Sequence, residues 1–140
     1  MPASDERPWH GRLRRLALGA AALLVCLAAC SRKPALPPPD QVYTLRGQIA
    51  ALPEPGKPAS DLVIHHEPIP GFVNRDGVAV GMDSMEMPFP PAPGVSLKGL
   101  SQGDVVEFTF EVRWKQAPFS QLTRITKLPP DTALNFGKAR

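Results

Sequence analysis

The stretch DVVEFTFEVRW, residues 104–114, decides the fold. Large apolar side chains occupy every second position: Val106, Phe108, Phe110, Val112 and Trp114. The positions between them are mostly polar. A period of two places alternate side chains on opposite faces of a β-strand, so the pattern predicts a strand with one face in a core. The turn-forming SQGD, residues 101–104, precedes it.

Four more stretches have strand-like composition. They are residues 41–52, 62–66, 85–89 and 119–128. Gly47 predicts a bulge in the first, and residues 116–118 predict a hairpin before the last. Only residues 95–100 are compatible with a helical turn. Five short strands without a long helix predict an all-β domain, a small closed or partly closed barrel, and a five-stranded OB-type barrel fits this size best.

The N-terminal residues 1–29 have the pattern of an export signal. Basic residues precede an apolar core, residues 16–27, of about 12 residues, which is shorter than the roughly 20 that span a membrane. The sequence LAAC that ends at Cys30 resembles a bacterial lipobox, in which the cysteine becomes the lipidated first residue. The alternative is an ordinary cleavage site with a cysteine nearby.

Removal of this signal changes what the composition implies. Residues 1–29 contain four arginines and two acidic residues, so the formal charge falls from +3 to +1. The basic pI therefore belongs largely to the signal, and nucleic acid is not an expected partner. Cys26 leaves with the signal and Cys30 is blocked by lipid, so no disulfide is expected. No nucleophile–base pair or phosphate loop stands out, which predicts a protein that is not an enzyme.

The predicted mature chain has three parts. Residues 30–40 contain four prolines and predict an extended tether between the lipid and the domain. Residues 41–130 are expected to form one small domain. Residues 131–140 are expected to be a flexible tail.

Three methionines cluster beside a pair of histidines. Apart from Met1, the chain contains only Met82, Met85 and Met87, and their neighbours in the domain are His65 and His66. On a strand, Met85 and Met87 share one face, and a loop can fold Met82 back toward it. His66 ends an inward-facing row, whereas His65 is expected to face solvent. Thioethers and imidazole suit Cu(I) and Ag(I).

Other interpretations of these residues remain open. Methionine is also a common filler of cores, although the clustering favours a metal site. Glu67 either accepts a hydrogen bond that orients His66 or is a solvated carboxylate at a strand end. Asp83 and Glu86 are either oxygen donors for Cu(II) or surface charges.

The stretches HEPIPGF, residues 66–72, and MEMPF, residues 85–89, resemble the copper-site segment of the CusF-like periplasmic copper/silver-binding domains, which also occur near Sco-type proteins. In that family a histidine opens an H-[DE]-x-I run and a later M-x-M-x-F closes the site. Gly103, Asp104, Val106 and Phe108 fit a further family element. The similarity covers about residues 41–128.

The resemblance implies an OB-type barrel that binds one Cu(I) or Ag(I) per domain, with His66, Met85 and Met87 as ligands. The best-known members have a tryptophan three residues before the first ligand methionine, where this chain has Met82. The resemblance leaves Met82 as either a further thioether ligand or a cap. Residues 73–81 are longer than the usual link, and are expected to form a flap or a small extra hairpin.

These observations predict a monomeric lipoprotein, anchored in the periplasm or outer cell envelope, that carries Cu(I) or Ag(I). It would act as a metallochaperone in copper resistance, efflux or delivery to a cuproenzyme. Its expected partners are the membrane, through the lipid, and a copper donor or acceptor protein such as an efflux component or an oxidase assembly factor. The alternatives are an OB-type interaction module without metal and an accessory domain of an enzyme on another chain.

Overall fold

The computed structural model describes residues 35–57 and 61–140. Within these residues the chain forms five strands: β1 Gln41–Ala51, β2 Val63–His66, β3 Met85–Pro88, β4 Val105–Val112 and β5 Ser120–Lys127. All five predicted strands are confirmed, with ends that differ by one or two residues. The expected signal, Cys30 and the start of the tether lie outside the described residues. The described part of the tether, residues 35–40, contains no helix or strand.

No helix occurs in the described residues, so none of them forms a membrane-spanning helix. Residues 95–100, where a helical turn was compatible with the sequence, contain a hydrogen-bonded turn instead. The Leu100 amide donates to the Leu97 carbonyl at 3.2 Å.

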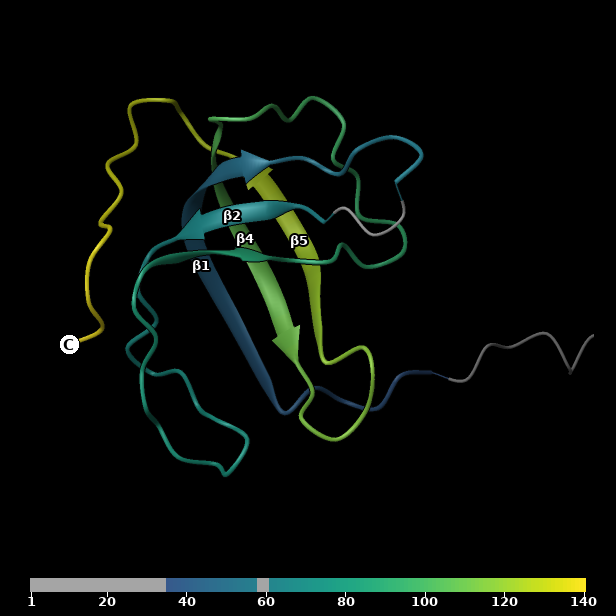
Figure 1. Ribbon diagram of the computed structural model, residues 1–140, viewed down its shortest axis with the longest axis vertical. Helices are drawn as coiled ribbons and strands as arrows, with labels where there is room; N and C mark the ends of the chain where they lie inside the picture. The colour runs from purple at the N-terminus through teal and green to yellow at the C-terminus, as the bar shows by residue number, and fades with distance from the viewer. Residues whose placement is uncertain (1–34, 58–60) are drawn as a thin grey trace, which may run out of the picture. The chain divides into compact units, whose positions relative to one another are not determined.

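All five strands belong to one antiparallel sheet in the order β3-β2-β1-β4-β5 (Figure 1). The long strand β1 is central. It pairs with β4 over residues 41–48 and with β2 over residues 47–51. β1 is therefore paired with both halves of the sheet, and the β2–β3 half is paired with its C-terminal end.

The two edge strands are connected by the segment that follows β3. The Leu122 amide of β5 donates to the Pro90 carbonyl, and the Ala92 amide donates to the Leu122 carbonyl, both at 2.8 Å. These bonds surround an isolated parallel bridge between Pro91 and Leu122. The expected all-β, five-stranded OB-type architecture is confirmed in its partly closed form, because no ladder joins β3 to β5 in the described residues.

The core lies on one side of this sheet and contains the apolar rows expected from the sequence. The Phe89 ring contacts two rings of β4, with centroids 4.7 Å from Phe108 and 5.1 Å from Phe110. Trp114 is partly buried at the edge of this core. The buried apolar cluster consists of Ile49, Leu62, Ile64, Ile69, Phe89, Val106, Phe108, Phe110, Val112 and Leu122.

Gly47 does not mark a bulge, contrary to the prediction. The irregularity in the β1–β2 register lies between Ile49 and Ala51, while Gly47 pairs regularly with His66. A Cβ atom at Gly47 would lie 2.6 Å from the His65 carbonyl oxygen. The glycine therefore lets β1 approach the backbone of β2 closely beside His66.

Residues 73–81 form a small extra hairpin, one of the two forms expected. Its two arms meet in an isolated antiparallel bridge. The side-chain oxygen of Asn74 accepts hydrogen bonds from the amides of Asp76, at 3.0 Å, and Val78, at 2.9 Å. The asparagine carboxamide thus closes the turn of the hairpin.

Candidate metal centre

The β2–β3 pair places the predicted ligands on one face. His66 lies directly opposite Met85, and Ile64 lies directly opposite Met87. Opposed residues in an antiparallel ladder point to the same side, with Cβ atoms about 4.5–5.5 Å apart. His66, Met85 and Met87 therefore share the core-facing side at the end of the pair.

His66 is a fully buried polar residue whose two ring nitrogens differ. Nδ1 lies 2.6 Å from the main-chain carbonyl oxygen of Glu67. A carbonyl can only accept, so Nδ1 carries the proton and Nε2 presents its lone pair. Nε2 is buried and has no hydrogen-bond partner.

An unsatisfied buried acceptor costs roughly 1–3 kcal/mol. A metal ion would satisfy Nε2 in the way that a ligand histidine is normally satisfied, with the other ring nitrogen donating to a carbonyl. The residues present thus fit a soft metal ion.

The surroundings of His66 favour its neutral, metal-binding form. Burial lowers the pKa of His66 below its ordinary value of 6.5, and the nearby His65 lowers it further. The hydrogen bond to the Glu67 carbonyl acts in the opposite direction, but burial is the largest of the three causes. The imidazole therefore needs no deprotonation to bind metal near neutral pH.

The three methionines differ in exposure. Met85 is 45% exposed, at the edge of the sheet. Met87 and Met82 are partly buried and pack against the apolar core. A metal ion held on this face would thus be bordered by core on one side and by the accessible Met85 side chain on the other.

Met82 is positioned by a bridge to Ile69. The Ile69 amide donates to the Met82 carbonyl at 2.8 Å, and the Met82 amide donates to the Ile69 carbonyl at 3.0 Å. This bridge continues the register of the β2–β3 ladder, because Ile69 is three residues after His66 and Met82 is three residues before Met85. On an unbroken strand, residues three apart face opposite sides. Because the ladder is interrupted between them, Met82 can pack on the core side.

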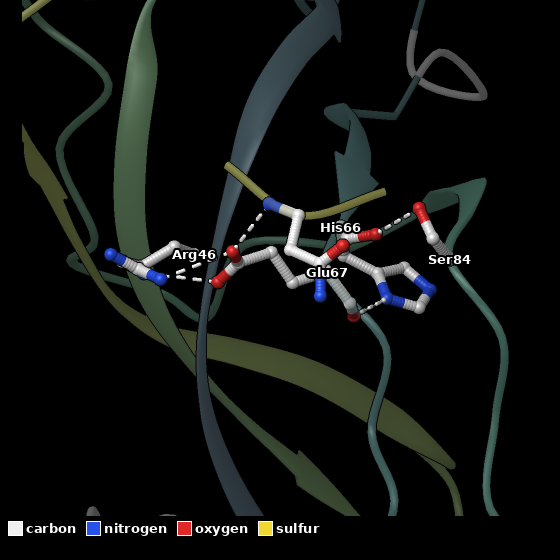
Figure 2. A network of polar contacts seen from close by, with 5 residues as sticks. Arg46, His66, Glu67 and Ser84 are labelled. Atoms are coloured by element: carbon white, nitrogen blue, oxygen red, sulfur yellow. Dashed lines mark hydrogen bonds and ion pairs between the residues drawn. The ribbon is translucent and has the colours of Figure 1, made fainter. Parts of the chain in front are cut away.

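Ser84 connects the two segments that contain the predicted ligands (Figure 2). Its hydroxyl donates to the main-chain carbonyl of His66 at 2.7 Å. The same oxygen lies 3.0 Å from Nε2 of His65. Since the hydroxyl has one proton, it accepts from His65, whose Nε2 therefore carries a proton.

Glu67 does not orient His66 through its carboxylate. Its carboxylate binds Arg46, with distances of 2.9 Å from Nε and 3.1 Å from Nη2, and accepts the amide of Asn135 at 2.8 Å (Figure 2). The main-chain carbonyl of Glu67 bonds to the imidazole instead. The carboxylate is turned toward Arg46 because a salt bridge is available there.

His65 lies on the opposite face from the methionines, as the strand period predicts, but it is not freely exposed. Its ring stacks on Phe136, with centroids 3.9 Å apart. Asp83 accepts a hydrogen bond from the Ala139 amide at 2.8 Å, and Glu86 is exposed opposite His65. No three His, Cys, Asp or Glu side chains of the described residues gather as a metal site.

Sequence reasoning missed three contributors to this site. Ser84 carries no local signal, and the signal of Gly47 was interpreted as a bulge, because both roles depend on which strands pair. The contacts of residues 135–139, which lie within the expected tail of residues 131–140, also went unpredicted.

The solved structures that resemble this chain include two of CusF. None of the curated proteins matches the chain. The crystal structure of Ag(I)CusF is 26% identical over 63% of this chain and 99% of that chain, with a TM-score of 0.45. The structure of apo-CusF residues 6–88 from Escherichia coli is 25% identical over 71% and 98%, with a TM-score of 0.47.

The decisive comparison is with protein families. The family described as copper binding periplasmic protein CusF matches residues 43–127, from within β1 to the last residue of β5. This range contains His66 and all three clustered methionines. The chain therefore belongs to the CusF family.

Proposed function

We propose that this protein binds one Cu(I) or Ag(I) ion through Nε2 of His66 and the thioether sulfurs of Met85 and Met87. The observation that carries the proposal is the buried, unpartnered Nε2 of His66 directly opposite Met85. The description of the family as copper binding, and the silver bound by one CusF structure, support the choice of metal.

The ligand set selects soft monovalent ions. Two thioethers and one imidazole are neutral, polarisable donors, which suit Cu(I) and Ag(I) better than Zn²⁺, Ca²⁺ or Mg²⁺. Binding releases no proton from methionine. The hydrogen bond from Nδ1 of His66 to the Glu67 carbonyl fixes the ring so that Nε2 faces the ion.

Met82 is a third sulfur donor in this proposal. It stands three residues before Met85 and packs on the core side beside Ile69. A third thioether would complete a four-coordinate site, whereas a methionine that only packs would leave the ion with three ligands.

The site is suited to transfer of the ion rather than to storage. Met85 is the accessible ligand, so an acceptor could replace it first. We propose that the protein works as a metallochaperone in copper resistance, efflux or delivery, and passes the ion to an efflux component or an oxidase assembly factor.

The place of action proposed is the periplasmic side of the cell envelope. The lipobox-like sequence at Cys30 would anchor the chain, and the proline-rich residues 30–40 would separate the domain from the lipid. Cys30→Ser should prevent lipidation and release the protein from membranes. Membrane association that survived this change, with normal removal of residues 1–29, would exclude a lipid anchor at Cys30.

The metal proposal is tested by anaerobic titration of residues 38–140 with Cu(I) against a chromogenic chelator. The fragment starts before Asp40 because the Asp40 carboxylate accepts the Trp114 amide at 2.7 Å. The expected result is one tightly held Cu(I) per chain. Failure to compete with the chelator would favour an interaction module in which the methionines only pack.

A further inference from the structure

The segment 135–139, here called the strap, contacts the end of β2. The Asn135 amide donates to Oε1 of Glu67 at 2.8 Å. The Phe136 ring stacks on His65 with an interplanar angle of 12°. In Figure 1 the C-terminal segment, in yellow, descends on the side where β2 ends. The strap therefore holds both sequence neighbours of His66.

The strap also contacts the segment that leads into β3. The Ser84 amide donates to the Gly137 carbonyl at 2.9 Å, and the Ala139 amide donates to Oδ1 of Asp83 at 2.8 Å. A Cβ atom at Gly81 would lie 3.0 Å from the Cβ of Ala139. The strap thus packs closely against residues 81–84, on both sides of Met82.

These contacts fall where the sheet is weakest. β2 and β3 are four residues each, and β3 is an edge strand. Their ladder ends at His66 and Met85, then resumes only at the single Ile69–Met82 bridge. Short edge pairings have little stability of their own. The strap supplies hydrogen bonds to residues 67, 83 and 84, all within that interruption.

The strap is separate from the core and from the proposed ligand face. None of its residues belongs to the buried cluster or packs against it, and Phe136 is 42% exposed. It meets His65 on the face opposite to His66. It also lies beyond residues 43–127, the part that matches the family.

We propose that the strap is a positioning element, which holds the segments of His66 and of Met82 and Met85 in the geometry that binds the metal ion. This inference rests on the proposed function. It adds that residues outside the proposed ligand set help the protein to retain the ion. Ordering the ligands before the ion arrives reduces the entropy that binding must overcome. Loss of the strap should therefore weaken binding and speed release, without changing stoichiometry.

The test compares the full chain with a chain truncated after Leu134, and uses deletion of Arg140 alone as the matched control. Ag(I) affinity is measured by competition, and the dissociation rate by transfer to an excess of chelator. We expect the truncated chain to lose about tenfold in affinity, as for one or two hydrogen bonds. Most of this loss should appear as faster dissociation. The control should behave as the full chain does.

A second readout separates positioning from stability. In the metal-free protein, the Ser84 amide should exchange with solvent faster after truncation, while core amides of β4 keep their protection. Two point variants test the strap if the truncated chain does not fold. Phe136→Tyr keeps an aromatic ring against His65 and should release Ag(I) as slowly as the full chain. Phe136→Leu removes that ring and should release Ag(I) faster.

The outcomes separate the two proposals. Equal Ag(I) affinity and dissociation rate with and without the strap would overturn the strap and leave the proposed function intact. Lack of Ag(I) binding by the full chain itself would overturn the proposed function, and the strap with it.

Discussion

His66 faces Met85 across the β2–β3 ladder, and Nε2 of this buried imidazole has no hydrogen-bond partner. The pairing places a buried imidazole, whose Nδ1 is bonded to the Glu67 carbonyl, opposite a thioether side chain that is exposed to solvent. Residues outside the pair help to position both. Gly47 lets β1 lie close to His66, and Ser84, just before Met85, donates a hydrogen bond to the His66 carbonyl.

The double variant Met85→Ile/Met87→Ile should lose Cu(I) binding and keep the fold. Isoleucine is apolar and close in volume to methionine, so packing changes little, but both sulfur donors are gone. Since partners outside the ligand shell can already be worth 10–100-fold, affinity should fall by roughly 100-fold or more. Chelator competition measures the affinity, and thermal unfolding of the metal-free protein checks the fold. Wild-type affinity in this variant would exclude the ligand assignment.

The two histidines should behave differently. His66→Ala removes the nitrogen donor and should abolish tight Cu(I) binding. His65→Phe removes both nitrogens at the neighbouring position but keeps an aromatic ring for Phe136, so binding should stay within a few-fold of wild type. A reversed result, measured by the same competition, would mean that the register of β2 is shifted by one residue, which exchanges its faces.

The stability of the metal-free protein should depend on pH through His66. Burial holds the pKa of His66 below its ordinary value of 6.5, so the unfolded state binds the proton more tightly than the folded state. As pH falls from about 6.5 toward the folded-state pKa, protons favour unfolding, and the free energy of unfolding decreases. Above this window the contribution is fully present.

Urea unfolding at pH 7.5 and pH 5.0 tests this linkage. His66→Leu removes the titrating group, so wild type should lose more stability than the variant between the two pH values. The difference removes the pH dependence that the two proteins share. Equal losses in both proteins would show that His66 titrates alike in the folded and unfolded states.

Gly47→Ala should destabilise the domain by about 1–3 kcal/mol, the usual range for overpacking. Its Cβ would approach the His65 carbonyl oxygen to 2.6 Å and Cγ2 of Ile64 to 2.7 Å. Gly71→Ala is the matched control, because a Cβ there meets nothing within 4 Å. Urea unfolding compares the two. Equal, small effects would mean that β2 moves away from β1 without cost.

The features that the sequence predicts well are local. The alternation of residues 104–114 and the turn before it predict β4 directly, and the period of two places Met85 and Met87 on one side. The interactions that it does not predict join distant residues. Arg46 attracts the Glu67 carboxylate across 21 positions, and Asn135 reaches it across 68.

The predicted bulge at Gly47 also failed because the role of this residue depends on strand pairing. Glycine is a common mark of a bulge, which is why Gly47 predicted one there. The close approach of β1 and β2 is what requires glycine at that position, and the register irregularity falls between Ile49 and Ala51 instead. Only the pairing of the strands, which no single stretch encodes, distinguishes these two uses.

Met82 provides the remaining test, because it stands where the best-known relatives place a tryptophan. One imidazole and two thioethers leave Cu(I) three-coordinate and open on one side. An indole ring can only cover that side, whereas a thioether can bind the ion. The bridge to Ile69 holds the Met82 backbone, and its side chain packs on the core side. The sulfur should therefore join the ligand set.

X-ray absorption at the copper edge counts the sulfur neighbours of the bound ion. The loaded protein should give about three sulfurs and one nitrogen, in line with the preference of Cu(I) for soft donors. Met82→Leu keeps the apolar volume and should give one sulfur fewer, with weaker retention of the ion. Two sulfurs in both proteins would show that Met82 only packs, and that the ion is either open to solvent or covered by the hairpin of residues 73–81.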